Sequence, residues 1–247
     1  MIGKYPAVIL WPEQGGITRG APAERRRFVD LVICQASAGY CADLVEYRKV
    51  VKQRNRVLSN GLAGRSVSPE ALESWNEQLV RYRSRLVAQR LQFVGEFRNH
   101  IMETYGWLMG LDEEPALSYV PFEEVDRSLT AEEIGQLLQL ELGERVEEER
   151  KFGSTLVGPH RDDFHLRING LDIRRYASQG QHKTFLIALK LAEFLYLQGV
   201  LGEKPLVLLD DVFGELDLER SRRLLGVLDK LGQTFITSTD TMCASRN

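Results

Sequence analysis

The chain has 247 residues, enough for one large domain or two modest ones, and its 43% hydrophobic and 27% charged residues are typical of a globular protein. The formal net charge of −3 excludes a polycation, so any nucleic-acid binding must depend on a local basic patch. The three cysteines include no CxxC pair, which predicts reduced thiols in a cytoplasmic protein. The sequence shows no apolar run near the roughly 20 residues of a membrane span and no secretory signal, so we expect no membrane partner.

The first half of the chain has a mainly helical pattern. The apolar run "YPAVILWPE" at residues 5–13 predicts a buried strand, and a helix begins near Pro22. Apolar residues then recur at steps of three, four or seven from Tyr40 to Leu58 and again from Leu72 to Ile101. These two amphipathic stripes, joined by a short loop, predict an antiparallel helical hairpin.

The second half mixes helices and strands. Thr130 and Glu133 form a capping-box pattern that opens a helix to about Arg150. Alternating apolar and polar residues around Asn169-Gly170 predict a β-hairpin. The strand "PLVLLDD", the helix "ERSRRLLGVLDKL" and the strand "QTFITSTD" form a βαβ unit. We therefore expect an α/β protein in three segments: residues 1–30 as the N-terminal piece of one lobe, 31–150 as an inserted helical lobe, and 151–247 as the C-terminal part of the first lobe.

Two short segments carry residues suited to phosphate chemistry. Asp210 and Asp211 end a strand of the buried parallel type, where open α/β sheets bind ligands. Carboxylates there can hold Mg²⁺ and orient a water molecule, although a strand can also simply end in two polar residues. Upstream, Ser178 and Gly180 open a helix, where free backbone N–H groups can bind an anion or merely form a cap.

These segments, taken in order, resemble a known family. "YASQGQHKTFLIALKLAE" and "PLVLLDDVFGELD" look like the signature motif, Walker B strand and D-loop of ABC-type ATPases. "RGAPAERRRFVD", "YRKVVKQRNRVL" and "VGPHRDDF" are similar to further blocks of the RecF branch, which acts in DNA replication and repair. The resemblance runs from about Gly3 to Asp240.

The resemblance implies an ABC-type ATPase head, here an incomplete P-loop NTPase sheet, with an inserted α-helical lobe. Such proteins form a homodimer on ATP, bind single-stranded or gapped duplex DNA, and support recombinase loading with recombination-mediator proteins in recombinational repair and the SOS response. By the same resemblance, Asp210 would hold Mg²⁺ and Asp211 would take the catalytic-base position. The residues that would face the nucleotide of the other subunit are Ser178, Gly180 and Gln181, with Asp217 in the D-loop.

The pattern departs from the family at the phosphate-binding loop. The chain contains no GxxxxGK[ST] motif, and its first third by family length is missing, so we expect a truncated form. Because that loop supplies most of the grip on the phosphates, we expect ATP and Mg²⁺ to bind only with a complete partner subunit. Whether the chain acts as an enzyme is left open.

Cations on the first helices could neutralise DNA phosphates. The candidates, which could equally form a solvated helical face, are Arg25, Arg26, Arg27, Lys52 and Arg54, with Lys49, Arg56, Arg81, Arg83, Arg85 and Arg90 as further cations.

Two other functions compete with a RecF-like repair ATPase. A transporter-type ABC subunit is disfavoured because the helical middle is too long for a transporter's helical subdomain. A non-enzymatic protein-interaction module that retains a degenerate ABC ATPase half stays open because the phosphate-binding loop is missing.

Overall fold

The computed structural model describes residues 5–62, 69–110, 112–121, 129–213 and 216–237. The chain divides into two compact units. We call Met1–Ala36, Val94–Ser118 and Phe164–Asn247 the sheet unit, and Ser37–Phe93 with Tyr119–Asp163 the helical unit. The helical unit overlaps much of the segment 31–150 that was expected to be helical, but it extends beyond that segment to Asp163, and residues 94–118 belong to the sheet unit. The three-segment domain division with boundaries at 30 and 150 stays a prediction.

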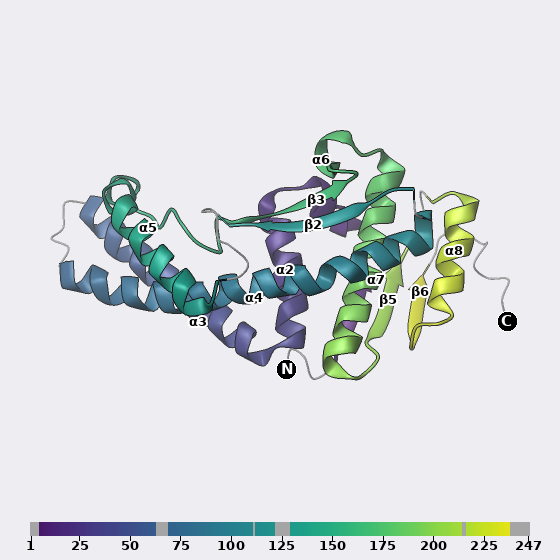
Figure 1. The fold of residues 1–247 in the computed structure, drawn as a ribbon, viewed down its shortest axis with the longest axis horizontal. Helices are drawn as coiled ribbons and strands as arrows, with labels where there is room; N and C mark the ends of the chain where they lie inside the picture. The colour runs from purple at the N-terminus through teal and green to yellow at the C-terminus, as the bar shows by residue number, and fades with distance from the viewer. Residues whose placement is uncertain (1–4, 63–68, 111, 122–128, 214–215, 238–247) are drawn as a thin grey trace. The chain divides into compact units, whose positions relative to one another are not determined.

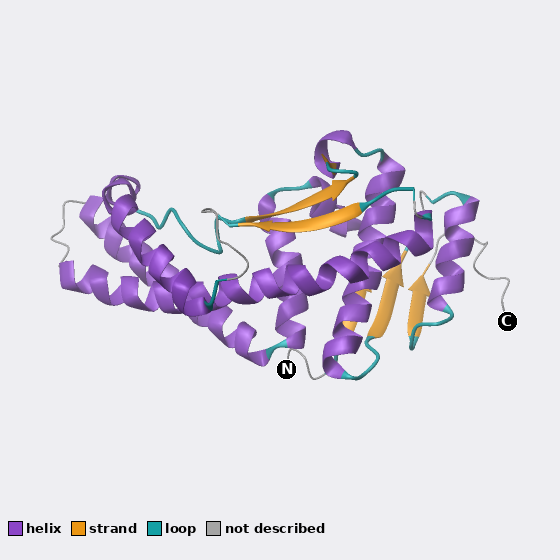
Figure 2. Cartoon of the chain, in the orientation of Figure 1, coloured by secondary structure: helices purple, strands orange, loops and turns teal. Residues whose placement is uncertain are grey.

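The sheet unit is built on three parallel strands in the order β1-β5-β6, drawn as arrows in Figures 1 and 2. They are β1 (Ala7–Leu10), β5 (Leu206–Asp210) and β6 (Thr234–Thr237). In β5 the run of apolar residues that predicted a buried strand pairs on both sides: Val207, Leu208 and Leu209 each have a partner in β1 and another in β6. The predicted βαβ unit is confirmed, with α8 (Leu218–Leu228) as the crossover helix between β5 and β6.

Helices of the sheet unit position the edge where β1 and β5 end. After β1 come a 3-10 turn, η1 (Pro12–Gly15), and two helices, α1 (Gly16–Arg19) and α2 (Pro22–Ala36). The predicted start at Pro22 is confirmed, because proline suits the first position of a helix. The long helix α7 (Gln179–Leu201) contacts β1, α1 and α2.

Among the described residues, α7 is the one helix long and apolar enough to cross a membrane by length and composition alone. The sequence interpretation, which found no such segment, overlooked it because two charged residues, Lys190 and Glu193, interrupt the apolar run. Most of its apolar stretch is buried inside the protein, so it serves as a core helix.

A second, antiparallel sheet has the order β2-β3-β4. Its strands are β2 (Pro115–Val120), β3 (Asp163–Ile168) and β4 (Leu171–Asp172), followed by the short helix α6 (Ile173–Tyr176). Asn169 and Gly170 form the predicted hairpin turn, with φ of 50° and 79°. Asparagine and glycine tolerate this left-handed region, which a two-residue turn between right-twisted strands requires. The second strand is shorter than its alternating pattern suggested, because Asp172 caps α6.

The helical unit contains α3 (Ala38–Leu62), the first part of α4 (Pro69–Met109) and α5 (Ala131–Phe152). Contacts join Arg90 with Tyr40, Arg85 with Asp43, and Arg54 with Asn76, so residue numbers rise on one helix as they fall on the other. The predicted antiparallel hairpin is therefore confirmed. The capping box that opens α5 is also confirmed: the Glu133 amide donates to Thr130 Oγ1 and the Thr130 amide donates to the Glu133 carboxylate.

Candidate nucleotide-facing site

The site is assembled from the N-terminus of α7 and the carboxyl end of β5. Ser178 is the N-cap of α7: its extended backbone ends the preceding segment, and its Oγ accepts a hydrogen bond of 3.2 Å from the Gln181 amide. In return, the Ser178 amide donates to Gln181 Oε1 at 2.9 Å. This capping box leaves Ser178 exposed and Gly180 half-buried at the positive end of a 23-residue helix. The turn that was predicted to face an anion is therefore accessible to solvent.

Arginine 220 of α8 lies beside this turn. A Cβ added to Gly180 would lie 2.9 Å from Arg220 Nη1, so the glycine allows the guanidinium to approach the backbone. Asp217 is the N-cap of α8, where its Oδ1 accepts from the Arg220 amide at 2.8 Å and its Oδ2 lies 3.4 Å from Arg220 Nε. Asp217 thus orients a cation next to Gly180, in addition to any role in the D-loop, of which residues 214–215 lie outside the described residues.

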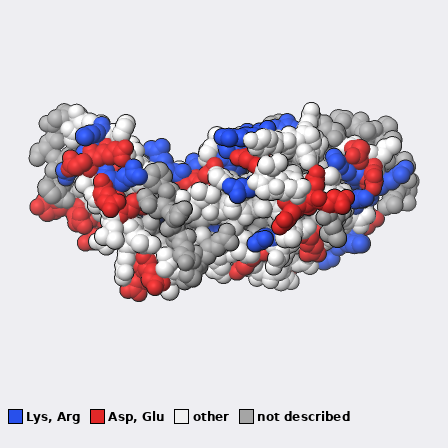
Figure 3. Space-filling model, turned by 45° about the horizontal axis from the view of Figure 1, so that its top comes forward, with Lys and Arg blue, Asp and Glu red and all other residues white. Residues whose placement is uncertain are grey.

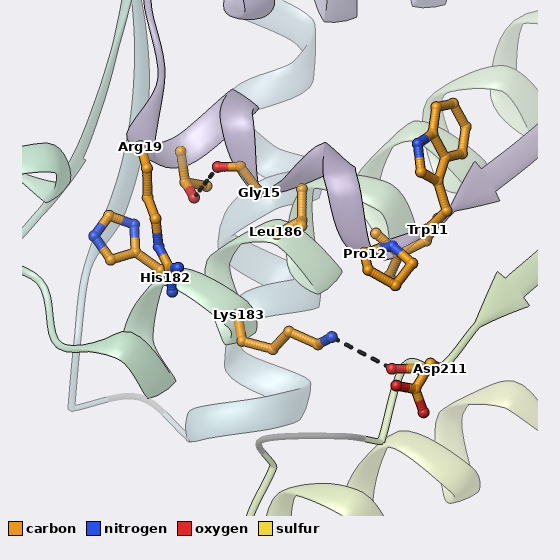
Figure 4. A pocket seen from close by; sticks show the side chains of 10 residues that line it. Trp11, Pro12, Gly15, Arg19, His182, Lys183, Leu186 and Asp211 are labelled. Atoms are coloured by element: carbon orange, nitrogen blue, oxygen red, sulfur yellow. Dashed lines mark hydrogen bonds between the residues drawn. The ribbon is translucent and has the colours of Figure 1, made fainter. Parts of the chain in front are cut away.

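Asp210 and Asp211 lie at the end of β5, as predicted. Asp210 accepts a hydrogen bond at Oδ1 from the hydroxyl of Thr237 on the neighbouring strand β6. Asp211 has a φ of 47°, a left-handed conformation that is strained for a residue with a side chain, and its amide donates to the Thr237 carbonyl at 3.1 Å. Backbone strain of this kind is concentrated at functional sites and persists only where surrounding contacts hold it. Lys183 of α7 donates to the Asp211 carbonyl at 3.4 Å (Figure 4), which links the two halves of the site.

A pocket of about 180 Å³ opens beside Asp211. Figure 4 shows Arg19, His182 and Lys183 on one side of it and Trp11 and Pro12 on the other. Burial, and then the neighbouring Arg19 guanidinium, lower the pKa of His182 below its ordinary value of 6.5. This histidine is therefore neutral at physiological pH, and Arg19 and Lys183 carry the positive charge of the pocket.

The carboxylates suit a magnesium ion that shares its coordination. Among the described residues, no group of three or more His, Cys, Asp or Glu side chains is arranged to hold a metal ion. Magnesium keeps several waters and needs only one or two carboxylates when phosphate oxygens supply the rest. The pair Asp210 and Asp211 fits that arrangement, in which a nucleotide completes the site.

The sequence interpretation missed Glu113, in the loop between α4 and β2. Its Oε1 accepts a hydrogen bond of 2.8 Å from Gln181 Nε2, and its Oε2 accepts one from the hydroxyl of Tyr105. No motif marks this glutamate, because its partners are 68 residues away at Gln181 and on the preceding helix at Tyr105. Only folding brings it to the site.

Burial contradicts part of the predicted DNA-contacting set. Arg25 is buried, and its Nη1 donates to the Gly20 carbonyl at 2.8 Å. Arg54 is fully buried and paired with Glu149 at 2.5 Å. Neither is presented to a nucleic acid, so the prediction was wrong for these two arginines, as it was for the further cations Arg83 and Arg90, which are also buried.

Other predicted DNA contacts remain at the surface. Arg27 and Lys52 are exposed, and Arg26 is half-buried. Figure 3 shows Lys and Arg interspersed with Asp and Glu on the visible face. Contact of these three residues with DNA stays a prediction.

Comparisons with known proteins identify the relatives of this chain. No family model matches the chain. The DNA replication and repair protein RecF of Chloroherpeton thalassium is 40% identical over 243 residues, which cover 97% of this chain and 66% of the relative. The RecF of Salinibacter ruber is also 40% identical over 243 residues and is covered to 59%. A solved structure described as the recombination mediator protein RecF-ATPrS in the RecFOR pathway matches with a TM-score of 0.87 and 31% identity, covering 97% of this chain and 64% of that one.

The chain thus spans about two thirds or less of the length of the relatives it matches. The close structural match confirms the predicted fold class, an incomplete α/β ABC-type ATPase head with an inserted helical lobe. High coverage of this chain at 35–40% identity across several bacteria places the whole of it in one family. The chain belongs to the RecF family of DNA replication and repair proteins.

Proposed function

We propose that this chain is the signature-bearing part of a RecF-type ATPase, which faces a nucleotide held by the phosphate-binding loop of a complete partner subunit. The observation that carries the proposal is the exposed capping box at the start of α7. Ser178 Oγ, the backbone at Gly180 and the Gln181 side chain would meet the γ-phosphate there, where the helix dipole favours negative charge.

The end of β5 has a role within the same proposal. Asp210 would hold Mg²⁺, and its bond from Thr237 fixes the carboxylate in place. Asp211 would orient or deprotonate the attacking water, from a backbone conformation that its neighbours enforce. Asp217 would lie at the face between subunits, where it directs Arg220.

ATP binding by these 247 residues alone is expected to be weak. The sequence contains no GxxxxGK[ST] motif, and the candidate phosphate contacts proposed here are limited to the start of α7 and the pocket beside Asp211. Isothermal titration of the chain with ATPγS should therefore show no micromolar binding. Micromolar affinity would contradict the idea that the partner supplies the phosphate grip.

The family relationship supports the wider role. We propose that a complete assembly, a cytoplasmic homodimer formed on ATP, binds single-stranded or gapped duplex DNA. With recombination-mediator proteins, it would support recombinase loading. The support is the RecF name of the relatives and the matched structures of RecF with ATP and an ATP analogue in the RecFOR pathway.

The test measures association between this chain and the complete RecF of Chloroherpeton thalassium. The chain is labelled with a fluorophore, and its sedimentation is followed with and without ATPγS and Mg²⁺. We expect a complex only with nucleotide, and Ser178→Ala should weaken it at least about tenfold, since it removes a contact to a charged phosphate.

Thr130→Ala is the matched control. It removes the same kind of capping box from α5, which belongs to the helical unit and contributes no residue to the proposed nucleotide face. Equal association by both variants, or no dependence on nucleotide in the wild type, would refute the proposal.

A further inference from the structure

Glu113 connects the core of the sheet unit to the signature turn. It is half-buried between α4 and β2, and each of its two carboxylate oxygens accepts a hydrogen bond from a different helix. Tyr105 of α4 donates from its hydroxyl to Oε2, and Gln181 of α7 donates from Nε2 to Oε1 at 2.8 Å. Both bonds involve a charged acceptor, which makes them stronger than bonds between neutral groups.

The Gln181 amide is held at both ends. Its Oε1 accepts from the Ser178 amide at 2.9 Å, while its Nε2 faces Glu113. Without the carboxylate, the amide group could rotate by half a turn and present Nε2 to the Ser178 N–H, which breaks that half of the capping box. The carboxylate accepts hydrogen bonds but cannot donate them, so it selects the one orientation that closes the box.

Tyr105 gives the carboxylate a rigid anchor. The tyrosine is fully buried, and its ring meets the ring of Phe185 on α7 edge-on, with centroids 5.8 Å apart. Burial, and then the bond to Glu113, hold the pKa of Tyr105 well above its ordinary value, so the hydroxyl stays a donor at every physiological pH. Glu113 is therefore fixed by a group that itself packs on the signature helix.

We infer that Glu113 is a positioning residue for the signature turn: by fixing the Gln181 amide it orients Ser178 towards the γ-phosphate. The inference rests on the proposed function. Glu113 acts through Gln181 and does not touch the nucleotide, because a carboxylate in contact with a phosphate would repel it.

The experiment compares three variants of the chain. Glu113→Ala removes the acceptor. Glu113→Gln keeps the shape and one oxygen for Gln181 Nε2, while its own amide can donate to the Tyr105 oxygen. Glu114→Ala is the matched control, because Glu114 is exposed and its carboxylate makes only a long contact, of 4.0 Å, with the guanidinium of Arg98.

The first measurement needs no partner. The side-chain amide protons of Gln181 are followed by nuclear magnetic resonance in the isolated chain. They should exchange with water at least about tenfold faster in Glu113→Ala than in the wild type or in Glu114→Ala, since their acceptor is gone. Unchanged exchange would overturn the inference.

The second measurement is the nucleotide-dependent association with Chloroherpeton thalassium RecF. Glu113→Ala should weaken it at least about tenfold, and Glu113→Gln should restore it to within about threefold of the wild type, with thermal unfolding recorded for each variant. If the wild type shows no nucleotide-dependent association, the proposed function fails and the inference fails with it. If the wild type associates and Glu113→Ala does so equally well, or Glu113→Gln is folded and still as weak as the alanine variant, the inference alone is refuted.

Discussion

Replacement of Arg54 by methionine should be among the most damaging single changes in the helical unit. The guanidinium is fully buried and makes three side-chain hydrogen bonds, to Glu149 at 2.5 Å, to Asn76 at 2.8 Å and to Thr155 at 2.9 Å. Glu149 is also fully buried, and its other oxygen accepts from the Leu156 amide at 2.9 Å. Methionine fills much of the same volume but leaves the Glu149 carboxylate without its cation.

The expected loss follows from that orphaned charge. Removing one partner of a buried ion pair destabilises a protein by about 3–5 kcal/mol, because the remaining charge has lost its water and its partner. That is a large fraction of the roughly 5–15 kcal/mol that stabilises a typical domain. The second change Glu149→Gln, made in the Arg54→Met background, removes the charge but keeps an oxygen for the Leu156 amide. We expect it to recover about 1–2 kcal/mol.

Urea unfolding followed by far-ultraviolet circular dichroism measures both changes. Arg56→Met is the matched control, because Arg56 is exposed on the same helix and its loss should alter stability by less than about 0.5 kcal/mol. The reasoning is refuted if Arg54→Met is within about 1 kcal/mol of this control, or if Glu149→Gln brings no recovery in the Arg54→Met background.

Four further substitutions test other parts of the fold. Because the pKa of His182 is lowered in the folded protein, the unfolded chain binds the proton more readily than the folded chain. The free energy of unfolding should therefore fall as the pH drops below 6.5, and this slope should flatten in His182→Gln, measured by unfolding at several pH values. Gly158→Ala should lower stability by more than about 1 kcal/mol, because the φ of Gly158 is 124° and an added Cβ would lie 2.5 Å from the Tyr47 hydroxyl. Gly143 lies in open space within α5, so Gly143→Ala should raise stability by about 0.5–1 kcal/mol. Equal effects of the two glycine changes in a thermal melt would contradict this. Thr130→Ala should destabilise α5 by about 1 kcal/mol through the lost cap, and unchanged amide exchange in the first turn of α5 would argue against that.

Local patterns in the sequence predicted the elements well. Helices begin where Pro22 and the Thr130–Glu133 box indicate, and the hairpin turns at Asn169-Gly170. Each of these signals acts within a few residues, through a fixed φ, a cap or a left-handed turn, so it needs no knowledge of the rest of the fold. The family was indicated in a different way, by the resemblance of several motif segments taken in their order along the chain.

The buried arginines were misread although the sequence carried a signal. Arg54 lies seven residues after Tyr47 and four before Leu58, on the same helical stripe. Arg83 and Arg90 occupy equivalent steps between Leu79, Leu86 and Phe93. A charge on an apolar stripe indicates a buried ion pair or hydrogen-bond network, but the position alone does not identify its partners.

Sequence alone therefore determined the starts of several helices, the hairpin turn and the residues that end β5 and open α7, because those depend on neighbours along the chain. The ordered motif segments indicated the class of fold by resemblance. Tertiary structure decided which charges are buried and what holds the signature turn. Arg54 meets Glu149 across 95 residues and Gln181 meets Glu113 across 68. Periodicity assigns a residue to a face of its helix, whereas the acceptor it meets depends on how distant segments pack against that face.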